Sequence, residues 1–169
     1  NKLTNERIFQ IIKLKDSHWK KGLVSQKKWF KKNIKFNDIH IFLLDTQKQL
    51  IGYNLLRRRN FFTDHGLKKN KECLYFDTLI IKKKYRGLNL SKKILFKTHE
   101  ISKKKKLPMI LICKKKTVKY YEKYGWLLLG KNNVHFLDHK FDTFAMTYCS
   151  TSYYKNNFLN KNINILINK

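Results

Sequence analysis

The feature that most constrains the fold is the stretch of residues 79–95, where a short apolar run passes through a basic turn into an amphipathic segment. The apolar run at residues 79–81 predicts the end of a strand, and apolar side chains at helical spacing beyond the turn predict a helix capped by Asn89 or Ser91. The first N–H groups of a helix have no intrahelical partner and carry partial positive charge, so they favour an anion. Gly87 lets a ligand approach the backbone. The stretch therefore predicts a strand, a phosphate-binding turn and a helix.

Segments on either side of this stretch predict further strands and helices. Two apolar segments flank a polar turn at residues 46–49 and predict a β-hairpin. Residues 114–124 predict a helix that ends at Gly125. The last two strands are expected to pair antiparallel. The predicted strands, besides one near the N-terminus, are residues 39–45, 50–56, 72–82, 109–113, 126–130 and 144–148.

The N-terminal residues have two interpretations. Residues 8–14 are rich in β-branched and apolar side chains and predict a first strand, although a helix from Asn5 is the alternative. Two short helices are predicted next, at residues 18–23 and, after a serine N-cap, at residues 26–33. The second helix is expected to turn Trp29 inward.

At 169 residues the chain is most simply one domain over residues 1–150. Residues 151–169 form an Asn- and Lys-rich extension, for which a frayed end, an added helix and a self-association segment all remain open. The three cysteines are scattered and lack Cys-x-x-Cys spacing, which indicates neither a disulfide framework nor a metal site. No apolar run reaches the roughly 18 residues of a membrane span. We therefore expect a cytoplasmic protein, as a monomer or homodimer.

The strongest compositional feature is a formal net charge of +28, from 39 Lys and Arg against 11 Asp and Glu. Such a charge is typical of proteins that bind nucleic acids or other anions. The basic residues are spread through every segment, however, and an abundance of Lys, Asn and Ile is typical of an A/T-rich genome. A nucleic-acid partner is therefore an alternative and not the favoured prediction.

Two motifs carry a resemblance to a known family. Arg86-Gly87-Leu88-Asn89-Leu90-Ser91 resembles the acetyl-CoA loop of the GCN5-related N-acetyltransferase (GNAT) superfamily, Arg/Gln-x-x-Gly-x-Gly/Ala, with Asn and Ser in place of the small residues. The stretch from Tyr120 to Trp126 resembles the family's Phe-Tyr-Glu-Lys-x-Gly-Phe, and its Tyr121 lies 35 residues beyond Arg86, a spacing typical of the family. Two partial motifs in this order are more specific than either one.

The resemblance implies a mixed α+β fold. The family has a central, twisted, mostly antiparallel sheet of six to seven strands, splayed between its fourth and fifth strands and flanked by about four helices. It also implies transfer of an acetyl group from acetyl-CoA to a primary amine, by direct attack in a ternary complex.

The resemblance implies a site for acetyl-CoA. In the family, a backbone N–H of the fourth strand polarises the thioester carbonyl, which maps to Leu79, Ile80 or Ile81. The pyrophosphate is expected on the N–H groups of the turn and helix start, with charge from Arg86 or nearby lysines, and Lys114 stands where the family often has an Asn. The predicted cofactor-binding residues are Leu79, Ile80, Ile81, Arg86, Gly87, Leu88, Asn89, Leu90, Ser91, Lys92 and Lys114.

Two residues are predicted to be catalytic. Tyr121 stands where many relatives have the tyrosine that donates a proton to the leaving thiolate; its structural alternative is a core position in an amphipathic helix. Asp77 is the only mid-strand charge of the strand predicted at residues 72–82, and a carboxylate there is costly unless it is paired or used. It is the predicted general base, with Glu72 and His65 as competitors; its structural alternative is a carboxylate bonded to backbone or to an arginine.

The amine acceptor is expected to meet a long loop at residues 57–71 and the N-terminal half. The predicted substrate-binding residues are Trp29, Arg57, Arg59, Phe61 and His65. The segment Ser-Gln-x-x-Trp-Phe resembles GNAT enzymes that acetylate amino sugars on nucleotide carriers. Alternatives are acetylation of tRNA or protein amines, and a non-catalytic module that binds acyl-CoA or nucleic acid.

Overall fold

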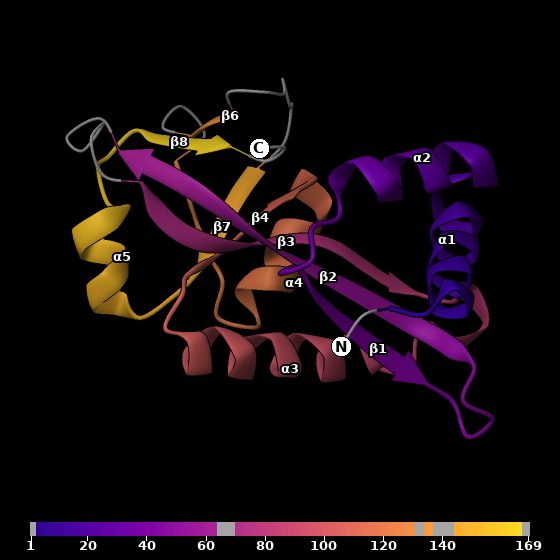
Figure 1. Ribbon diagram of the computed structural model, residues 1–169. Helices are drawn as coiled ribbons and strands as arrows, with labels where there is room; N and C mark the ends of the chain where they lie inside the picture. Colours follow the sequence, from indigo (N-terminus) through magenta and orange to yellow (C-terminus); the bar gives the residue numbers. More distant parts are fainter. Residues whose placement is uncertain (1–2, 64–69, 131–133, 137–143, 167–169) are drawn as a thin grey trace. The chain divides into compact units, whose positions relative to one another are not determined.

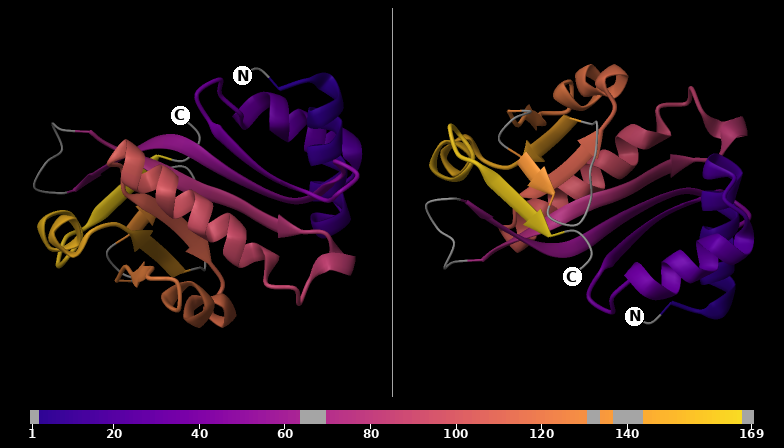
Figure 2. Two further views of the ribbon diagram at one scale, coloured as in Figure 1. Left: turned by 90° about the horizontal axis from the view of Figure 1, so that it is seen from below. Right: turned by 90° about the horizontal axis from the view of Figure 1, so that it is seen from above.

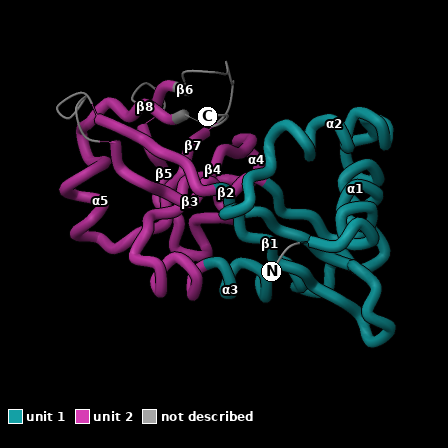
Figure 3. The backbone as a smooth tube through the Cα atoms, viewed as in Figure 1, with its two compact units in different colours: residues 1–57, 78–98 teal, residues 58–77, 99–169 magenta. Residues whose placement is uncertain are grey.

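The computed structural model describes residues 3–63, 70–130, 134–136 and 144–166 (Figure 1). The chain divides into two compact units (Figure 3). The first unit comprises residues 1–57 and 78–98, and the second comprises residues 58–77 and 99–169. Strands β2 (Leu50–Thr63) and β3 (Lys71–Ile81) each contribute one part to each unit.

The first unit begins with helix α1 (Asn5–Trp19), so the strand predicted at residues 8–14 is wrong and the alternative helix from Asn5 is confirmed. Thr4 caps the helix, since its side-chain oxygen accepts a hydrogen bond from the N–H of Arg7 at 3.2 Å. Ile11, Ile12, Leu14 and Lys15 are the buried residues of the helix. Their spacing is that of one helix face, which outweighs the β-branched composition of the segment.

Helix α1 ends at Trp19, and the φ of 50° at its C-cap Lys20 lies in the left-handed region, so the short helix predicted at residues 18–23 is wrong. Helix α2 (Leu23–Asn33) confirms the next predicted helix but begins after Gly22, earlier than the serine N-cap. Figure 1 shows α1 and α2 side by side.

The predicted hairpin is confirmed in the first unit. Strand β1 (Ile39–Leu44) pairs antiparallel with β2, and the carboxylate of Asp45 accepts hydrogen bonds from the N–H groups of Gln47 and Gln49 in the turn. A core forms on one face of these strands, with side chains of α1 and α2 packed on those of β2 and β3. Its buried members are Ile11, Leu14, Phe30, Leu50, Tyr53, Leu55 and Ile80.

Helix α3 (Leu90–Lys105) begins on the other face of the strands in the first unit (Figure 2). Gly52 of β2 lies under it, and a Cβ built on Gly52 would lie 2.9 Å from Ile81 Cδ1, 3.1 Å from Leu43 Cβ and 3.2 Å from Ile94 Cδ1. The absence of a side chain at this position therefore allows helix and strands to approach closely.

Gly52→Ala should lower the free energy of unfolding by about 1–3 kcal/mol, because the added methyl group overpacks this contact. Urea unfolding measures the change. Gly22→Ala is the control, because a Cβ there meets nothing within 4 Å, so it isolates the cost of a positive φ. An unchanged stability for Gly52→Ala would contradict the close packing of α3 on β2.

The second unit contains the remaining strand pairs. Strand β3 pairs parallel with β4 (Met109–Cys113), β4 pairs antiparallel with β7 (Phe144–Tyr148), and β7 pairs antiparallel with β5 (Leu127–Leu128). The predicted strand at residues 109–113 and the closing antiparallel pair are confirmed. With β1 and the C-terminal strands, the described residues form a mixed, mostly antiparallel sheet flanked by helices, as predicted.

The C-terminal extension joins the sheet of the second unit. After helix α5 (Thr151–Asn157), strand β8 (Ile163–Leu166) pairs antiparallel with residues 60–63 of β2 and parallel with β6 (Val134–Phe136). Ile163 and Ile165 are 1% and 0% exposed. The extension thus supplies core residues to this unit.

The long loop predicted at residues 57–71 is wrong at both of its ends, because β2 continues to Thr63 and β3 begins at Lys71; residues 64–69 lie outside the described residues. Phe61 lies on β2 with a fully buried side chain, and its ring stacks on Phe158 at a centroid distance of 5.1 Å. It is therefore a core residue, not a loop residue exposed to an acceptor. His65 lies outside the described residues.

The parallel ladder between β3 and β4 is short. It consists of the pairs Leu74–Met109 and Tyr75–Ile110, and within the described part of the second unit neither Phe76 nor Leu111 extends it. These strands are the predicted fourth and fifth, and an early end of their pairing is what a splayed sheet requires. None of the helices in the described ranges has the length and apolar character needed to cross a membrane.

Candidate active site

The predicted phosphate-binding turn follows β3 in the first unit. A 3-10 helix, η2 (Lys83–Tyr85), leads into the turn, and α3 begins at Leu90. Gly87 and Asn89 have φ angles of 85° and 53°, so the asparagine adopts the left-handed conformation that the family's glycine supplies. Residues 86–89 are exposed, and a Cβ on Gly87 would meet nothing within 4 Å. The backbone of the turn is therefore open to a ligand.

Arg86 fixes the conformation of this turn. Its Nε donates a hydrogen bond to the carbonyl oxygen of Ile81 at 3.0 Å, and its Nη2 lies 2.9 Å from Nδ1 of His18 at the end of α1. An arginine can only donate, so His18 accepts through an unprotonated Nδ1. The guanidinium joins the last residue of β3 to α1 and keeps its positive charge beside the turn.

Two further hydrogen bonds hold the turn to the β1–β2 hairpin. The hydroxyl of Tyr85 donates to the carboxylate of Asp45 at 3.2 Å, and the N–H of Lys82 donates to the carbonyl of Ile51 at 2.8 Å. The sequence interpretation missed His18, Tyr85 and Asp45. No spacing signal could have found them, because the contacts join residues that are 68 and 40 positions apart.

Acetyl-CoA binding should weaken as the pH falls through the titration of His18. Partial burial and the charge of Arg86 both lower the pKa of His18 from its ordinary value of 6.5. The neutral ring therefore accepts from Arg86 at pH 7, and the contact is lost as the pH falls through this lowered pKa. His18→Gln, which keeps an acceptor, should remove the part of this pH dependence that His18 causes below pH 6.5, with little loss of affinity at pH 7.

His18→Lys should raise the Kd for acetyl-CoA about two- to fivefold at pH 7, since it sets a second cation against Arg86 at an exposed site. Isothermal titration of CoA at several pH values measures both variants. If His18→Lys binds CoA as wild type does, His18 does not position the turn.

The end of β3 in the first unit contains Leu79, Ile80 and Ile81. Ile80 is 1% exposed and belongs to the core, whereas its two neighbours are half-buried. Just before them, the side-chain amide of the fully buried Asn54 donates to the carbonyl of Thr78 at 2.6 Å. This bond fixes β2 to β3 next to the backbone amides that are predicted to polarise the thioester.

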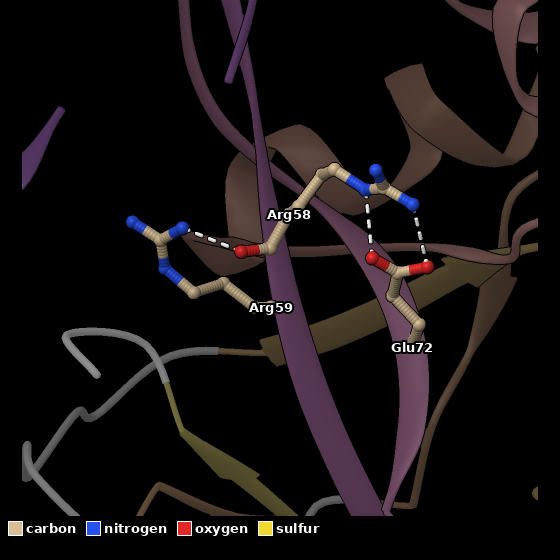
Figure 4. Close-up of polar contacts among 3 residues, drawn as sticks. All are labelled: Arg58, Arg59 and Glu72. Carbon is tan, nitrogen blue, oxygen red and sulfur yellow. Dashed lines mark hydrogen bonds and ion pairs between the residues drawn. The ribbon is translucent and has the colours of Figure 1, made fainter. Parts of the chain in front are cut away.

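The predicted bases lie on the part of β3 that belongs to the second unit. Asp77 is half-buried between the buried residues Phe76 and Thr78. Glu72 forms a bidentate ion pair with Arg58, with Nε–Oε1 and Nη2–Oε2 both 2.7 Å (Figure 4). Because both oxygens of Glu72 are engaged, this carboxylate is poorly placed to take a proton from a substrate.

Tyr121 lies on helix α4 (Lys115–Glu122) of the second unit, in contact with other aromatic rings. Its ring packs edge to face with those of Phe76, Trp126 and Tyr120 at centroid distances of 6.1, 5.9 and 5.3 Å. Burial raises the pKa of the Tyr121 phenol, with smaller contributions from Cys113 and Tyr120. The phenol therefore stays protonated at neutral pH, as a proton donor must.

Lys114, which is predicted to bind the cofactor, is the exposed N-cap residue of helix α4 in the second unit. Its carbonyl accepts hydrogen bonds from the N–H and the hydroxyl of Thr117, both at 2.9 Å. Its side chain is thus available to an anionic ligand, while its backbone begins the helix that carries Tyr121.

Trp29 in the first unit lies among cations. Nζ of Lys15 is 3.2 Å from the centroid of the indole ring, and Cζ of Arg57 is 5.8 Å from it. Lys15 is 5% and Arg57 2% exposed, while Trp29 is half-buried. Lys15 covers one face of the ring, so that face is not a platform for a nucleotide base. The sequence interpretation missed Lys15 because its burial is evident only once residues 5–19 form a helix.

Arg59 lies in the second unit and is 2% exposed; its Nη1 donates to the carbonyl of Arg58 (Figure 4). It therefore lies within the protein interior, not on a loop. Among the described residues, no group of three or more His, Cys, Asp or Glu side chains could hold a metal ion.

Comparisons with known proteins identify a family and a fold. The family described as "Acetyltransferase (GNAT) domain" matches residues 3–149. The fold is similar to that of the GNAT family N-acetyltransferase YhbS from Escherichia coli in complex with CoA, at 10% identity and a TM-score of 0.71 over 98% of this chain and 86% of that one.

A histone acetyltransferase HPA2-related protein from Corynebacterium glutamicum has 13% identity and a TM-score of 0.64, over 88% of this chain and 94% of that one. The NatC complex bound to Gag peptide and CoA contains a chain with 14% identity and a TM-score of 0.61, over 88% and 93%. At such identities the solved structures establish the fold alone. Among curated proteins, none matches this chain.

Proposed function

Because this chain belongs to the GNAT acetyltransferase family and is thus an acyltransferase that uses acetyl-CoA, we propose that it acetylates the primary amine of a small, negatively charged molecule. The amine attacks directly in a ternary complex. An amino sugar on a nucleotide carrier is the acceptor class that we favour.

The residues of the turn fit acetyl-CoA. A diphosphate needs backbone N–H groups, an approach free of side chains and positive charge. The open backbone at Gly87 and Asn89, the N-terminus of helix α3 and the guanidinium of Arg86 meet these needs. Lys92 adds positive charge in the first unit, and Lys114 adds it in the second. When bound, acetyl-CoA supplies the acetyl thioester.

Two side chains handle protons in this proposal. Tyr121 keeps the proton on its phenol oxygen at neutral pH and passes it to the departing sulfur as the thioester C–S bond breaks. Asp77 receives the proton of the attacking amine, directly or through water. A backbone N–H among residues 79–81 stabilises the negative charge that develops on the carbonyl oxygen.

The acceptor class rests on the buried cations around Trp29. Lys15 and Arg57 both lie within 6 Å of one indole centroid and are almost fully buried. They place positive charge in the first unit, whose N-terminal residues are expected to meet the acceptor, and a positive field attracts an acceptor that carries a phosphate or carboxylate.

The observation that carries the proposal is the Arg86 contact that holds an open, left-handed turn at the start of α3. The test is an assay of thiol release from acetyl-CoA with a panel of amines that contains UDP- and dTDP-amino sugars, their neutral sugar counterparts, N-terminal peptides and tRNA. We expect turnover of the nucleotide-linked amines and little of the neutral sugars. The net charge of +28 favours the alternative acceptors, tRNA and protein amines. Turnover of tRNA or peptide alone would therefore contradict our proposal and support that alternative.

A further inference from the structure

Helices α1 and α2 form an apolar groove on the surface of the first unit. The groove has a volume of about 470 Å³, and Ile12 lies in its floor. Phe9, Leu23 and Val24 line it although they are 50%, 42% and 70% exposed, and Lys27 and Lys31 line its edge. Single exposed apolar residues are ordinary, but several around one concave surface mark an interaction site.

The lining residues follow helix periodicity on both helices. On α1 they recur from Asn5 through Phe9 to Ile12, and on α2 from Leu23 through Lys27 to Lys31. Each helix thus presents one stripe, and the two stripes are the walls of the groove. Figure 1 shows that the two helices are neighbours. A groove of this kind accepts the apolar stripe of a third helix, with anchors at i, i+3 or i+4, and i+7.

The charged residues around the groove determine which kind of helix can bind in it. Lys27 and Lys31 are exposed at the edge, and Nζ of Lys13 lies 4.4 Å from the ring centroid of Phe9. The nearby carboxylate of Glu6 accepts a hydrogen bond from Gln10. A second copy of a chain with a net charge of +28 would be repelled, whereas an acidic partner is attracted. A flat membrane surface would leave a concave groove unfilled.

We propose that this groove docks an amphipathic helix of a partner protein, with apolar anchors on one face and Asp or Glu beside them. The anchors occupy the space lined by Phe9, Leu23 and Val24, and the acids meet Lys27 and Lys31. The docking is separate from acetyl transfer, so its test requires binding alone and does not depend on the proposed function.

The experiment measures fluorescence anisotropy with a labelled synthetic peptide that has Leu at i, i+3, i+4 and i+7 and Glu at most other positions. One control peptide has Lys in place of Glu, and another has Ser in place of Leu. The protein variants are Val24→Glu and the double variant Lys27→Glu/Lys31→Glu. Phe36→Glu is the matched control, because Phe36 is a fully exposed aromatic residue of the same unit that does not line the groove.

We expect the Leu/Glu peptide to bind, and Val24→Glu and the double variant each to raise its Kd about tenfold or more, while Phe36→Glu changes it less than about twofold. Circular dichroism confirms that each variant is folded. The proposal is overturned if the Leu/Glu and Ser/Glu peptides bind equally, since that is charge attraction alone. It is also overturned if Val24→Glu and Phe36→Glu act alike, or if the chain binds phosphatidylserine vesicles or RNA through these residues but not the peptide.

Discussion

Tyr121→Phe should lower kcat about 100-fold or more while the KM for acetyl-CoA changes little. The substitution removes only the phenol oxygen, so the ring contacts with Phe76 and Trp126 persist and the protein stays folded. Loss of a positioned proton donor typically costs about 10²–10⁴ in rate. Steady-state kinetics with the best acceptor of the amine panel measures both constants.

Tyr120→Phe and Tyr124→Phe are matched controls for this prediction. They remove the same oxygen from half-buried tyrosines of the same segment, one residue before Tyr121 and three after it. Both should keep kcat within about twofold of wild type, as is usual for substitutions away from the chemistry. A Tyr121→Phe enzyme as fast as these controls would make Tyr121 a packing residue, which is the structural alternative for this position.

The pH profile gives a second check of the same assignment. Burial raises the pKa of Tyr121 above its ordinary value of 10.0, so the phenol keeps its proton throughout the range below that pH. The rate should therefore show no loss from tyrosine ionisation up to pH 10. A basic limb in wild type between pH 8 and 9 that Tyr121→Phe removes would contradict the raised pKa.

Trp126→Ala should destabilise the protein by about 3–5 kcal/mol, the usual cost of truncating a large buried aromatic side chain. Trp126 is 1% exposed, and its ring contacts those of Phe76, Tyr121 and Tyr148 at centroid distances of 5.4, 5.9 and 5.9 Å. Since Tyr121 is one of these neighbours, the cavity should also release the tyrosine ring and lower kcat at temperatures where the variant is still folded.

Two other variants serve as references for the loss of stability in Trp126→Ala. Trp126→Phe keeps most of the apolar contact and removes an indole N–H that has no hydrogen-bond acceptor among the described residues, so its cost should be clearly smaller. Leu128→Ala, at a 40% exposed position in β5, should change stability by less than about 1 kcal/mol. Thermal and urea unfolding measure all three, and equal stability of Trp126→Ala and Leu128→Ala would show that the ring is not part of the core.

The parts of the fold that local sequence determines could be predicted. The strand, turn and helix around Gly87 depend on neighbouring residues only, and so do the β1–β2 hairpin and the helix that ends near Gly125. The left-handed φ of Asn89 is likewise a local property. These segments carry the two motifs on which the family resemblance rests, which is why the family was recognisable.

The errors come from partners that are distant in the chain. Residues 60–63 resemble a polar loop in sequence because nothing near them indicates that β8 pairs with them. Phe61 is buried in a core cluster whose other members, Phe158 and Ile163 among them, are distant in the chain. The N-terminal helix resembles a strand in composition because it is rich in β-branched residues, but the spacing of Ile11, Ile12 and Lys15 places them on one buried helix face. His18 can be assigned to the site only from its hydrogen bond to Arg86, which lies 68 positions away in the chain.

The most direct test of the account is hydrogen exchange by mass spectrometry with and without a saturating, non-hydrolysable acetyl-CoA analogue. We expect exchange to slow at the amides of residues 87–92, where the diphosphate should accept their N–H groups, and to slow less in His18→Lys at the same subsaturating concentration of analogue. An analogue that binds tightly and leaves the exchange of residues 87–92 unchanged would contradict the account.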